Sequence, residues 1–286
     1  MIVRKMNLKA KKEDMERIFH PRRLAIVGVS TDGGARGFGI GMLTGLQAMK
    51  FAGEIFPVNP KGGSYAGLNF YRKVEDIPGQ IDFAIIAVAA KDVPEALEAC
   101  RKKGAAGAEI LSAGFSEMAT KEGRELENAI SEIADRGIRV VGPNCFGIYC
   151  PRSGLTLLPG PDLSRISGPV AFLSQSGGMA IDLAHKGKWM GLKFSKVVSF
   201  GNGADLRETE LLRYLSDDPE TGVIAMYVEG VRDGDAFLDA LKYASARKPV
   251  VILKAGTTKA GAKAASSHTG SLAGADVAYT AAFKHS

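Results

Sequence analysis

The chain has 286 residues, of which 45% are hydrophobic and 24% charged, so it is long enough for two globular domains of ordinary size. Most of its net charge of +6 lies in the first 24 residues, which hold eight Lys or Arg against three acidic residues. The remainder is close to neutral and has no stripe of basic and aromatic residues, which argues against a nucleic-acid partner.

Residues 1–20 form a basic leader that we interpret as a solvated arm, because they lack the apolar segment of a secretory signal. The longest apolar run, residues 83–90, is too short to span a bilayer. Cys100, Cys145 and Cys150 are odd in number and form no CxxC pair, so we expect neither a disulfide framework nor a metal site. The sequence therefore predicts a cytoplasmic protein without membrane contact.

Strands and helices alternate in the first half of the chain. The predicted strands are residues 24–29, 55–58, 82–88, 108–113 and 138–142, and the predicted helices are residues 40–51, 92–103 and 121–136. The strand segments are almost continuously apolar, as expected for parallel strands that are covered on both faces. This pattern predicts a doubly wound α/β domain over residues 21–145.

A segment rich in proline and glycine, residues 146–168, interrupts this alternation and is interpreted as a linker. A second alternation follows. Its predicted strands are residues 169–174, 196–200, 222–228 and 249–254, and its predicted helices are residues 177–190, 205–217, 233–246 and 275–284. We therefore expect a second, smaller, flavodoxin-like domain over residues 169–286. No strand follows the last helix, which suggests a truncated C-terminus.

The segment "AIVGVSTDGGARGFGIG" joins the first predicted strand to a helix, and Gly28 is the first of its glycines. Such a turn lets backbone approach an anion at a helix N-terminus. The spacing is not GxGxxG, because Ser30 stands where the second glycine would be. Lys61 follows the second strand, where a dinucleotide-binding domain has a carboxylate. A cation there suits a phosphorylated ribose, as in coenzyme A or NADP, although a purely structural turn remains the alternative.

"FLSQSGG" is a second turn between a strand and a helix, and its Ser176 and Gly177 are candidates for a second anion site. A simple helix cap is the alternative reading. Glu229 ends a predicted strand at the carboxyl edge, where open α/β sheets place their sites. An ordinary surface carboxylate is its alternative.

His268 lies in "KAASSHTGSLAG", among residues too small to pack an imidazole into a core. No neighbouring residue has metal-ligand spacing, so we interpret His268 as a nucleophile at neutral pH. A phosphorylated His268 would suit the helix start at Ser176–Gly177, and Glu229 could orient its ring. The remaining histidines are interpreted as structural: His20, His185 and His285.

Six segments in this order resemble the α-type part of NDP-forming acyl-CoA synthetases, which include ADP-forming acetyl-CoA synthetases and their succinyl-CoA synthetase relatives. They are "FHPRRLAIVGVS", "FPVNPK", "VGPNCFGI", "LSQSGG", "YVEG" and "SSHTGSLAG". The resemblance covers the chain from about residue 17. It implies a Rossmann-like CoA-binding domain followed by a flavodoxin-like ligase domain.

The resemblance also implies a reaction, acyl-CoA + NDP + phosphate ⇌ acid + CoA + NTP, through an acyl phosphate and a phosphohistidine. His268 then matches the phosphorylated histidine, Glu229 the carboxylate that orients it, and Ser176 and Gly177 the helix start that holds the phosphate.

For coenzyme A, the resemblance places Gly28 and Ser30 in the binding turn and Lys61 near the 3′-phosphate. Asn144 lies in a loop near the thiol end. Cys145 beside it is interpreted as packing, because the mechanism needs no cysteine nucleophile.

The sequence contains no ATP-grasp domain, so the Mg-nucleotide is expected on a β-type subunit or domain rather than on this chain. The resemblance also implies a hetero- or homo-oligomer. A CoA-binding regulatory module without catalysis is the alternative, but it would have no use for His268, Glu229 and Ser176 together. An NADP-dependent oxidoreductase is disfavoured by the departure from GxGxxG.

Overall fold

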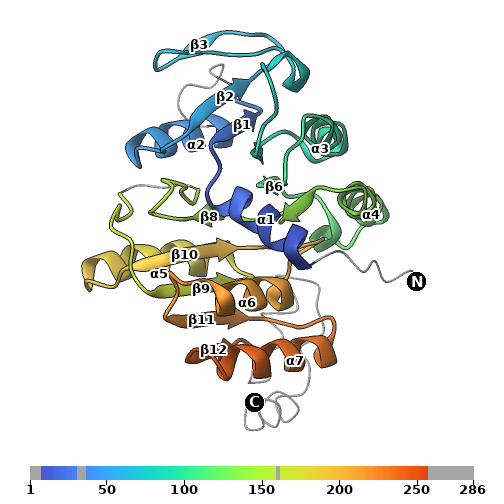
Figure 1. The fold of residues 1–286 in the computed structure, drawn as a ribbon. Coiled ribbons are helices and arrows are strands. Elements are labelled where there is room, and N and C mark those ends of the chain that lie inside the picture. The colour runs from blue at the N-terminus through green and yellow to red at the C-terminus, as the bar shows by residue number, and fades with distance from the viewer. Residues whose placement is uncertain (1–7, 31–36, 159–161, 257–286) are drawn as a thin grey trace.

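The computed structural model describes residues 8–30, 37–158 and 162–256, with the side chains described from residue 12 onward. Two α/β units follow one another along the chain, and each is built on a five-stranded sheet (Figure 1). Nine predicted strands lie in the described part, and each corresponds to a strand of one of these sheets within two to three residues at either end. The predicted helix at residues 275–284 and the predicted end of the chain lie outside the described residues.

The first sheet is parallel throughout and has the order β2-β1-β5-β6-β7. Its strands are β1 (Arg23–Val27), β2 (Glu54–Val58), β5 (Phe83–Ile86), β6 (Gly107–Ile110) and β7 (Arg139–Val141). The connecting helices are α2 (Phe38–Ala48), α3 (Val93–Lys102) and α4 (Lys121–Asp135). Short elements complete this half: β3 (Ser64–Tyr65), β4 (Leu68–Asn69), η1 (Val74–Asp76), η2 (Ala90–Asp92) and η3 (Ser116–Met118).

Strand β1 shows why this sheet reads as continuously apolar in the sequence. Leu24 and Ile26 belong to one buried cluster, together with residues of α2, whereas Ala25 and Val27 belong to another, together with residues of α3 and α4. Successive side chains of a strand point to opposite faces, so both faces of the sheet are covered. The prediction of a doubly wound, Rossmann-like domain is confirmed.

The second sheet has the order β12-β11-β9-β10-β8. Its parallel strands are β9 (Val170–Ser174), β10 (Phe194–Ser199), β11 (Val223–Val228) and β12 (Val250–Lys254), and its helices are α5 (Gly177–Trp189), α6 (Glu208–Asp217) and α7 (Gly234–Ser245). The antiparallel edge strand β8 (Gly147–Tyr149) was not predicted and lies within the predicted linker. It is only three residues long and is followed by a turn, so its sequence carries little strand pattern.

The interpretation of the leader as a solvated arm is wrong from Leu8 onward, because α1 (Leu8–Phe19) is a helix with a buried stripe. Met15, Ile18 and Phe19 are at most 5% exposed. Their spacing of three and four residues puts them on one helix face. The ring of Phe19 stacks on Tyr214 of α6, with centroids 5.0 Å apart. Helix α1 therefore packs between the two sheets.

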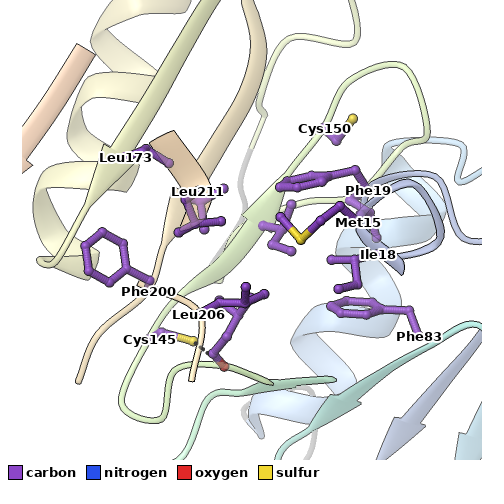
Figure 2. Close-up of a cluster of buried hydrophobic side chains, with 14 of the residues drawn as sticks. Met15, Ile18, Phe19, Phe83, Cys145, Cys150, Leu173, Phe200, Leu206 and Leu211 are labelled. Carbon is purple, nitrogen blue, oxygen red and sulfur yellow. Dashed lines mark hydrogen bonds between the residues drawn. The ribbon is translucent and has the colours of Figure 1, made fainter. Parts of the chain in front are cut away.

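The two halves of the chain share one hydrophobic cluster (Figure 2). Phe83 of the first sheet and Leu173 of the second belong to it, with Phe19 of α1. Backbone hydrogen bonds also connect the two halves. The amide of Ala204 donates to the carbonyl of Gly142 (2.9 Å), and the amide of Leu206 donates to that of Val140 (2.9 Å). The loop between β10 and α6 thus runs alongside β7 and the residues that follow it. The predicted domain boundaries stay predictions.

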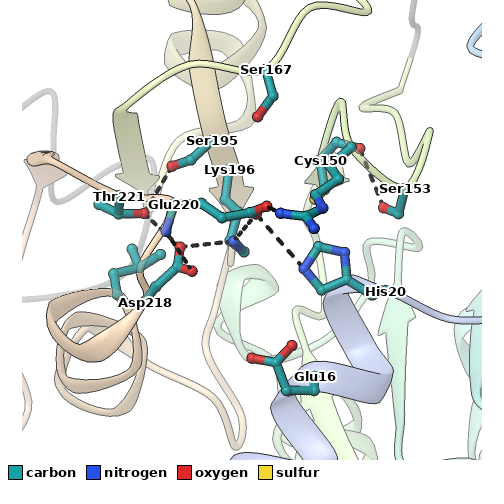
Figure 3. Close-up of polar contacts among 12 residues, drawn as sticks. Glu16, His20, Cys150, Ser153, Ser167, Ser195, Lys196, Asp218, Glu220 and Thr221 are labelled. Carbon is teal, nitrogen blue, oxygen red and sulfur yellow. Dashed lines mark hydrogen bonds and ion pairs between the residues drawn. The ribbon is translucent and has the colours of Figure 1, made fainter.

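A buried ion cluster joins the halves at the amino end of β10 (Figure 3). Lys196 lies within hydrogen-bonding distance of Asp218 and Glu220. Glu220 in turn contacts Arg152 and lies 3.8 Å from His20, which follows α1.

Among the described helices, none is long and apolar enough to cross a membrane.

Candidate functional site

Gly28 follows β1 directly and has a conformation that favours glycine, with φ of +100°. A Cβ at Gly28 would lie 2.6 Å from the carbonyl oxygen of Ala87, and one at Gly39 in α2 would lie 2.4 Å from that of Gly28. The amides of Gly28 and Val29 both donate to Val58 (3.0 and 3.2 Å). Gly39 therefore allows the close approach of α2 to the strand end, and Gly28 allows that of the Ala87 backbone. The amide of Gly28 is already bound to the protein.

Asn59, which the sequence reasoning missed, connects the two predicted CoA-binding segments. Its Nδ2 donates to the carbonyl of Val29 (2.5 Å), and its Oδ1 accepts from the Lys61 amide (2.8 Å). Half-buried Ser30 follows Val29, and Lys61 is exposed. The structure thus brings Ser30 and Lys61 onto neighbouring loops at the carboxyl edge of the first sheet. The Asn-Pro pair in "FPVNPK" was the available signal for a turn here.

Asn144 follows β7 with φ of +55°, and its amide donates to the carbonyl of Ser112 (2.9 Å). Its side-chain Nδ2 lies 3.4 Å from Oδ1 of Asn202, which comes from the second half of the chain. Nδ2 of Asn202 donates to the carboxylates of Glu117 (2.5 Å) and Glu127 (2.8 Å). Because carboxylates only accept, they fix which end of the Asn202 amide faces Asn144. Asn202 was also missed, since its role depends on contacts distant in sequence.

Cys145 is 2% exposed, and its Sγ lies 3.3 Å from the carbonyl oxygen of Ile110. Burial strongly raises the pKa of the Cys145 thiol, and the charge of Glu109 raises it further. A thiol of this kind is protonated at neutral pH, so Cys145 is a packing residue and a poor nucleophile.

Ser176 is the N-cap of α5, and its hydroxyl accepts from the Met179 amide (3.4 Å). The amides of Gly177 and Gly178 come just before that of Met179. They lie in the first turn of α5, where helix amides lack intrahelical acceptors. A Cβ at Gly177 would lie 2.8 Å from the ring of Phe146. The amide of Phe146 is held in turn by Ser199 at the end of β10 (3.0 Å). Phe146 therefore places the Asn144 loop against the helix start at Ser176–Gly177.

Glu229 follows β11 and is only 3% exposed, so the alternative of an ordinary surface carboxylate is wrong. Its amide donates to Oε1 of Gln175 (2.5 Å), and its carbonyl accepts from Nζ of Lys254 (2.9 Å). Burial raises the pKa of Tyr227, and the charge of Glu229 raises it further, so these two side chains interact. The structure brings Glu229 next to the Ser174–Ser176 turn, because β11 and β9 are neighbours.

His268 lies outside the described residues. What is described is a carboxyl edge of the second sheet that carries a buried carboxylate and a capped helix start, with the Asn144 loop beside them. Such an edge can hold an anion at the helix N-terminus and can orient a group that donates to a carboxylate.

Comparison with known proteins shows two domain families along the chain. Residues 22–151 match a CoA binding domain, and residues 167–286 match a succinyl-CoA ligase like flavodoxin domain. The chain is 44% identical over 276 residues to acetate–CoA ligase [ADP-forming] I of Archaeoglobus fulgidus, covering 95% of this chain and 39% of that protein. It is 41% identical over 277 residues to the α subunit of acetate–CoA ligase [ADP-forming] I of Pyrococcus furiosus, covering 95% and 59%.

Among solved structures, dinucleotide forming acetyl-coenzyme A synthetase 1 of Ca. Korarchaeum cryptofilum, in complex with phosphate and ADP, is similar with a TM-score of 0.87 and 39% identity. That match covers 94% of this chain and 57% of the other. The chain thus spans between 39% and 59% of the length of these three proteins. With both domains matched in order, the chain belongs to the NDP-forming acyl-CoA synthetase family and corresponds to its α-type part.

Proposed function

We propose that this chain is the α-type part of an NDP-forming acyl-CoA synthetase that interconverts acyl-CoA, phosphate and NDP with a carboxylic acid, CoA and NTP. Phosphate displaces CoA from the acyl group and gives an acyl phosphate. Its phosphoryl group moves to a nitrogen of His268 and releases the acid, and NDP then takes it to give NTP. The supporting observation is the buried Glu229 beside the capped helix start at Ser176, within one sheet edge.

The residues of that edge have separate roles in the proposal. The amides at Ser176–Gly177 bind the phosphoryl group, because a helix N-terminus favours an anion. Glu229 accepts from the other ring nitrogen of His268 and so fixes its tautomer. A regulatory CoA-binding module would need neither group, so the alternative function is disfavoured by their presence.

Coenzyme A is proposed to lie along the carboxyl edge of the first sheet. Ser30 lies in its binding turn, and the exposed Lys61 pairs with the 3′-phosphate. Asn144, held beside the helix start by Phe146, lies near the thiol end of the cofactor. This arrangement places the thioester and the phosphate site at the joint between the two halves.

The nucleotide, with its Mg²⁺, is proposed to bind an ATP-grasp subunit or domain. The similar Pyrococcus furiosus protein is named as an α subunit, whereas the similar Archaeoglobus fulgidus protein is longer and its name mentions no subunit. Both arrangements fit a phosphohistidine that reaches a partner, so a hetero- or homo-oligomer is proposed. All three cysteines are free and buried, which fits the proposed cytoplasmic location.

The test is incubation with acetyl phosphate labelled with ³²P, followed by measurement of acid-labile phosphate on the protein. Labelling is expected in the wild type, lost in His268→Asn and reduced in Glu229→Gln. His185→Asn, on α5, is the matched control and should label like the wild type. Equal labelling of His268→Asn would overturn the mechanism, and CoA binding without any labelling would favour the regulatory module.

A second test addresses the CoA site. CoA should raise the melting temperature more than dephospho-CoA does, and Lys61→Met should remove this difference. Lys121→Met, at an exposed position of α4, should keep it. An unchanged difference in Lys61→Met would remove the proposed role of Lys61.

A further inference from the structure

Gln175 stands between the two parts of the proposed phosphoryl site. It is the residue before Ser176 in the chain, and its side chain reaches across to the end of β11. There Oε1 accepts from the amides of Glu229 (2.5 Å) and Gly230 (3.0 Å), and Nε2 donates to the carbonyl of Gly230 (2.8 Å). One side chain thus makes three hydrogen bonds to a neighbouring strand end.

These hydrogen bonds lie just beyond the point where the backbone pairing between β9 and β11 ends. Strand β9 pairs with β11 up to Ser174, opposite Tyr227, and then turns into α5. Glu229 therefore lies beyond the last paired residue of β9, yet it is buried, and buried backbone groups need partners. The side-chain amide of Gln175 provides the hydrogen bonds that β9 no longer offers to the backbone at Glu229 and Gly230. Its orientation is fixed, because only an oxygen can accept from both amides.

The backbone of Glu229 is thereby held on both sides. Its amide is bound by Gln175, and its carbonyl accepts from Nζ of Lys254 at the end of β12. Backbone held in this way restricts where the Glu229 carboxylate can lie relative to the helix start at Ser176. Such restriction matters for group transfer, since a displacement of about 1 Å can cost on the order of 100-fold in rate.

From these contacts we propose that Gln175 is a positioning residue for phosphoryl transfer: it sets the place of the Glu229 carboxylate relative to the anion-binding amides of α5. This inference rests on the proposed function and adds to it a residue that need not touch the substrate. The neighbouring Ser176 binds the phosphoryl group, whereas Gln175 acts through Glu229.

The test compares Gln175→Met, which keeps the length of the side chain and removes the amide, with Gln80→Met. Gln80 is the matched control because it precedes β5 at the opposite, amino edge of the first sheet. In Gln175→Met the maximal rate of labelling by acetyl phosphate should fall about 10- to 100-fold. The affinity for CoA should be unchanged, and Gln80→Met should label like the wild type.

A double variant separates positioning from general loss of structure. If Gln175 acts through Glu229, then Gln175→Met should cost little further rate in a Glu229→Gln background. Costs that multiply in the double variant, or wild-type labelling by Gln175→Met, would overturn the inference.

Amide hydrogen exchange tests the hydrogen bonds independently of the reaction. Exchange at Glu229 and Gly230 should accelerate in Gln175→Met and remain slow in Gln80→Met; unchanged exchange would overturn the inference even where labelling is reduced. Failure of the wild type to label would instead overturn the proposed function, and with it the role of Gln175 in transfer.

Discussion

The ammonium group of Lys196 lies 2.7 Å from the carboxylate of Asp218, and the two side chains are 0% and 4% exposed. Lys196 is also 3.0 Å from Glu220, and it lies over the ring of Phe19 at 5.7 Å from the centroid. Because Phe19 belongs to α1, this buried cation connects the N-terminal helix to the second sheet. A buried pair of this kind contributes little net stability as a pair, but removing one partner leaves an uncompensated charge.

We therefore expect Lys196→Met to lower the free energy of unfolding by about 3 to 5 kcal/mol. The matched control is Lys121→Met, whose ion pair with Glu125 is exposed on α4, and which should cost about 0.5 kcal/mol or less. Urea unfolding followed by circular dichroism measures both. Equal costs for the two variants would mean that the buried cluster does not hold α1 in place.

His20 gives the same joint a dependence on pH. Burial lowers the pKa of His20 from 6.5 and the charge of Lys196 lowers it further, against the opposing carboxylates of Glu220 and Glu16. The unfolded chain therefore takes up a proton at a higher pH than the folded chain does. Stability should fall as the pH drops through 6.5 and should level off below the folded pKa.

The measurement is the free energy of unfolding between pH 7.5 and pH 5, compared between wild type and His20→Gln. The variant should lose less stability over this range than the wild type, and His185→Gln should behave like the wild type. The neighbouring carboxylates do not obscure the effect. Burial raises the pKa of Asp218 and of Glu220, but the hydrogen bonds and charges of Lys196 and the other surrounding partners together outweigh it, so both pKa values lie below their ordinary acidic values. If the free energy of unfolding of His20→Gln changed with pH in parallel with that of the wild type, His20 would not be a source of the pH dependence.

The sequence was informative where local pattern determines structure. Apolar runs predicted the parallel strands because both faces of each sheet are covered, as Leu24 and Ala25 show. The strand ends then placed Glu229 and Ser176 at one edge. In contrast, α1 was misread because its basic residues dominate the composition, while its apolar stripe is only three residues long.

The residues that sequence reasoning missed act through contacts between distant segments. Gln175 bonds a strand end 54 residues away, and Asn202 bonds Glu117 across 85 residues. An amide side chain carries no pattern that distinguishes such a role from an exposed glutamine or asparagine. Only the fold shows which carbonyl, amide or carboxylate it meets.

Gly201 tests the joint at the carboxyl edge. It has φ of +50°, and a Cβ there would lie 2.2 Å from the carbonyl oxygen of Asn144. Gly67 is the matched control, because its φ is +81° but nothing lies within 4 Å of its Cβ position. Gly67→Ala should cost about 1 kcal/mol from backbone strain, and Gly201→Ala about 1 to 3 kcal/mol more.

Thermal unfolding compares the two glycine variants, and acetyl phosphate labelling shows whether the Asn144 loop has moved. Gly201→Ala should also label more slowly than Gly67→Ala, because Phe146, in the same loop, packs on Gly177. Equal melting temperatures would indicate that the loop adjusts freely at this contact.

Cys145 tests whether the reaction uses a thiol of this chain. It lies next to Asn144 in the loop beside the helix start, which is where a thioester intermediate would need a nucleophile. Its thiol is buried, donates to Ile110 and has a raised pKa, so the thiolate is not available at neutral pH. We expect Cys145→Ala to keep labelling from acetyl-CoA and ³²P-labelled phosphate, which must pass through attack on the thioester, within about 3-fold of the wild type, with some loss of stability from the cavity.

The matched control is Cys100→Ala, since Cys100 is also fully buried and burial raises its pKa to about 12. Iodoacetamide at pH 8 should modify neither thiol in the folded protein and both after unfolding in urea. The opposite pattern would be rapid alkylation of Cys145 in the folded state, together with loss of labelling from acetyl-CoA and phosphate, but not from acetyl phosphate, in Cys145→Ala and no loss in Cys100→Ala. That result would place an acyl–cysteine step before the phosphohistidine, and direct attack of phosphate on the thioester would have to be abandoned.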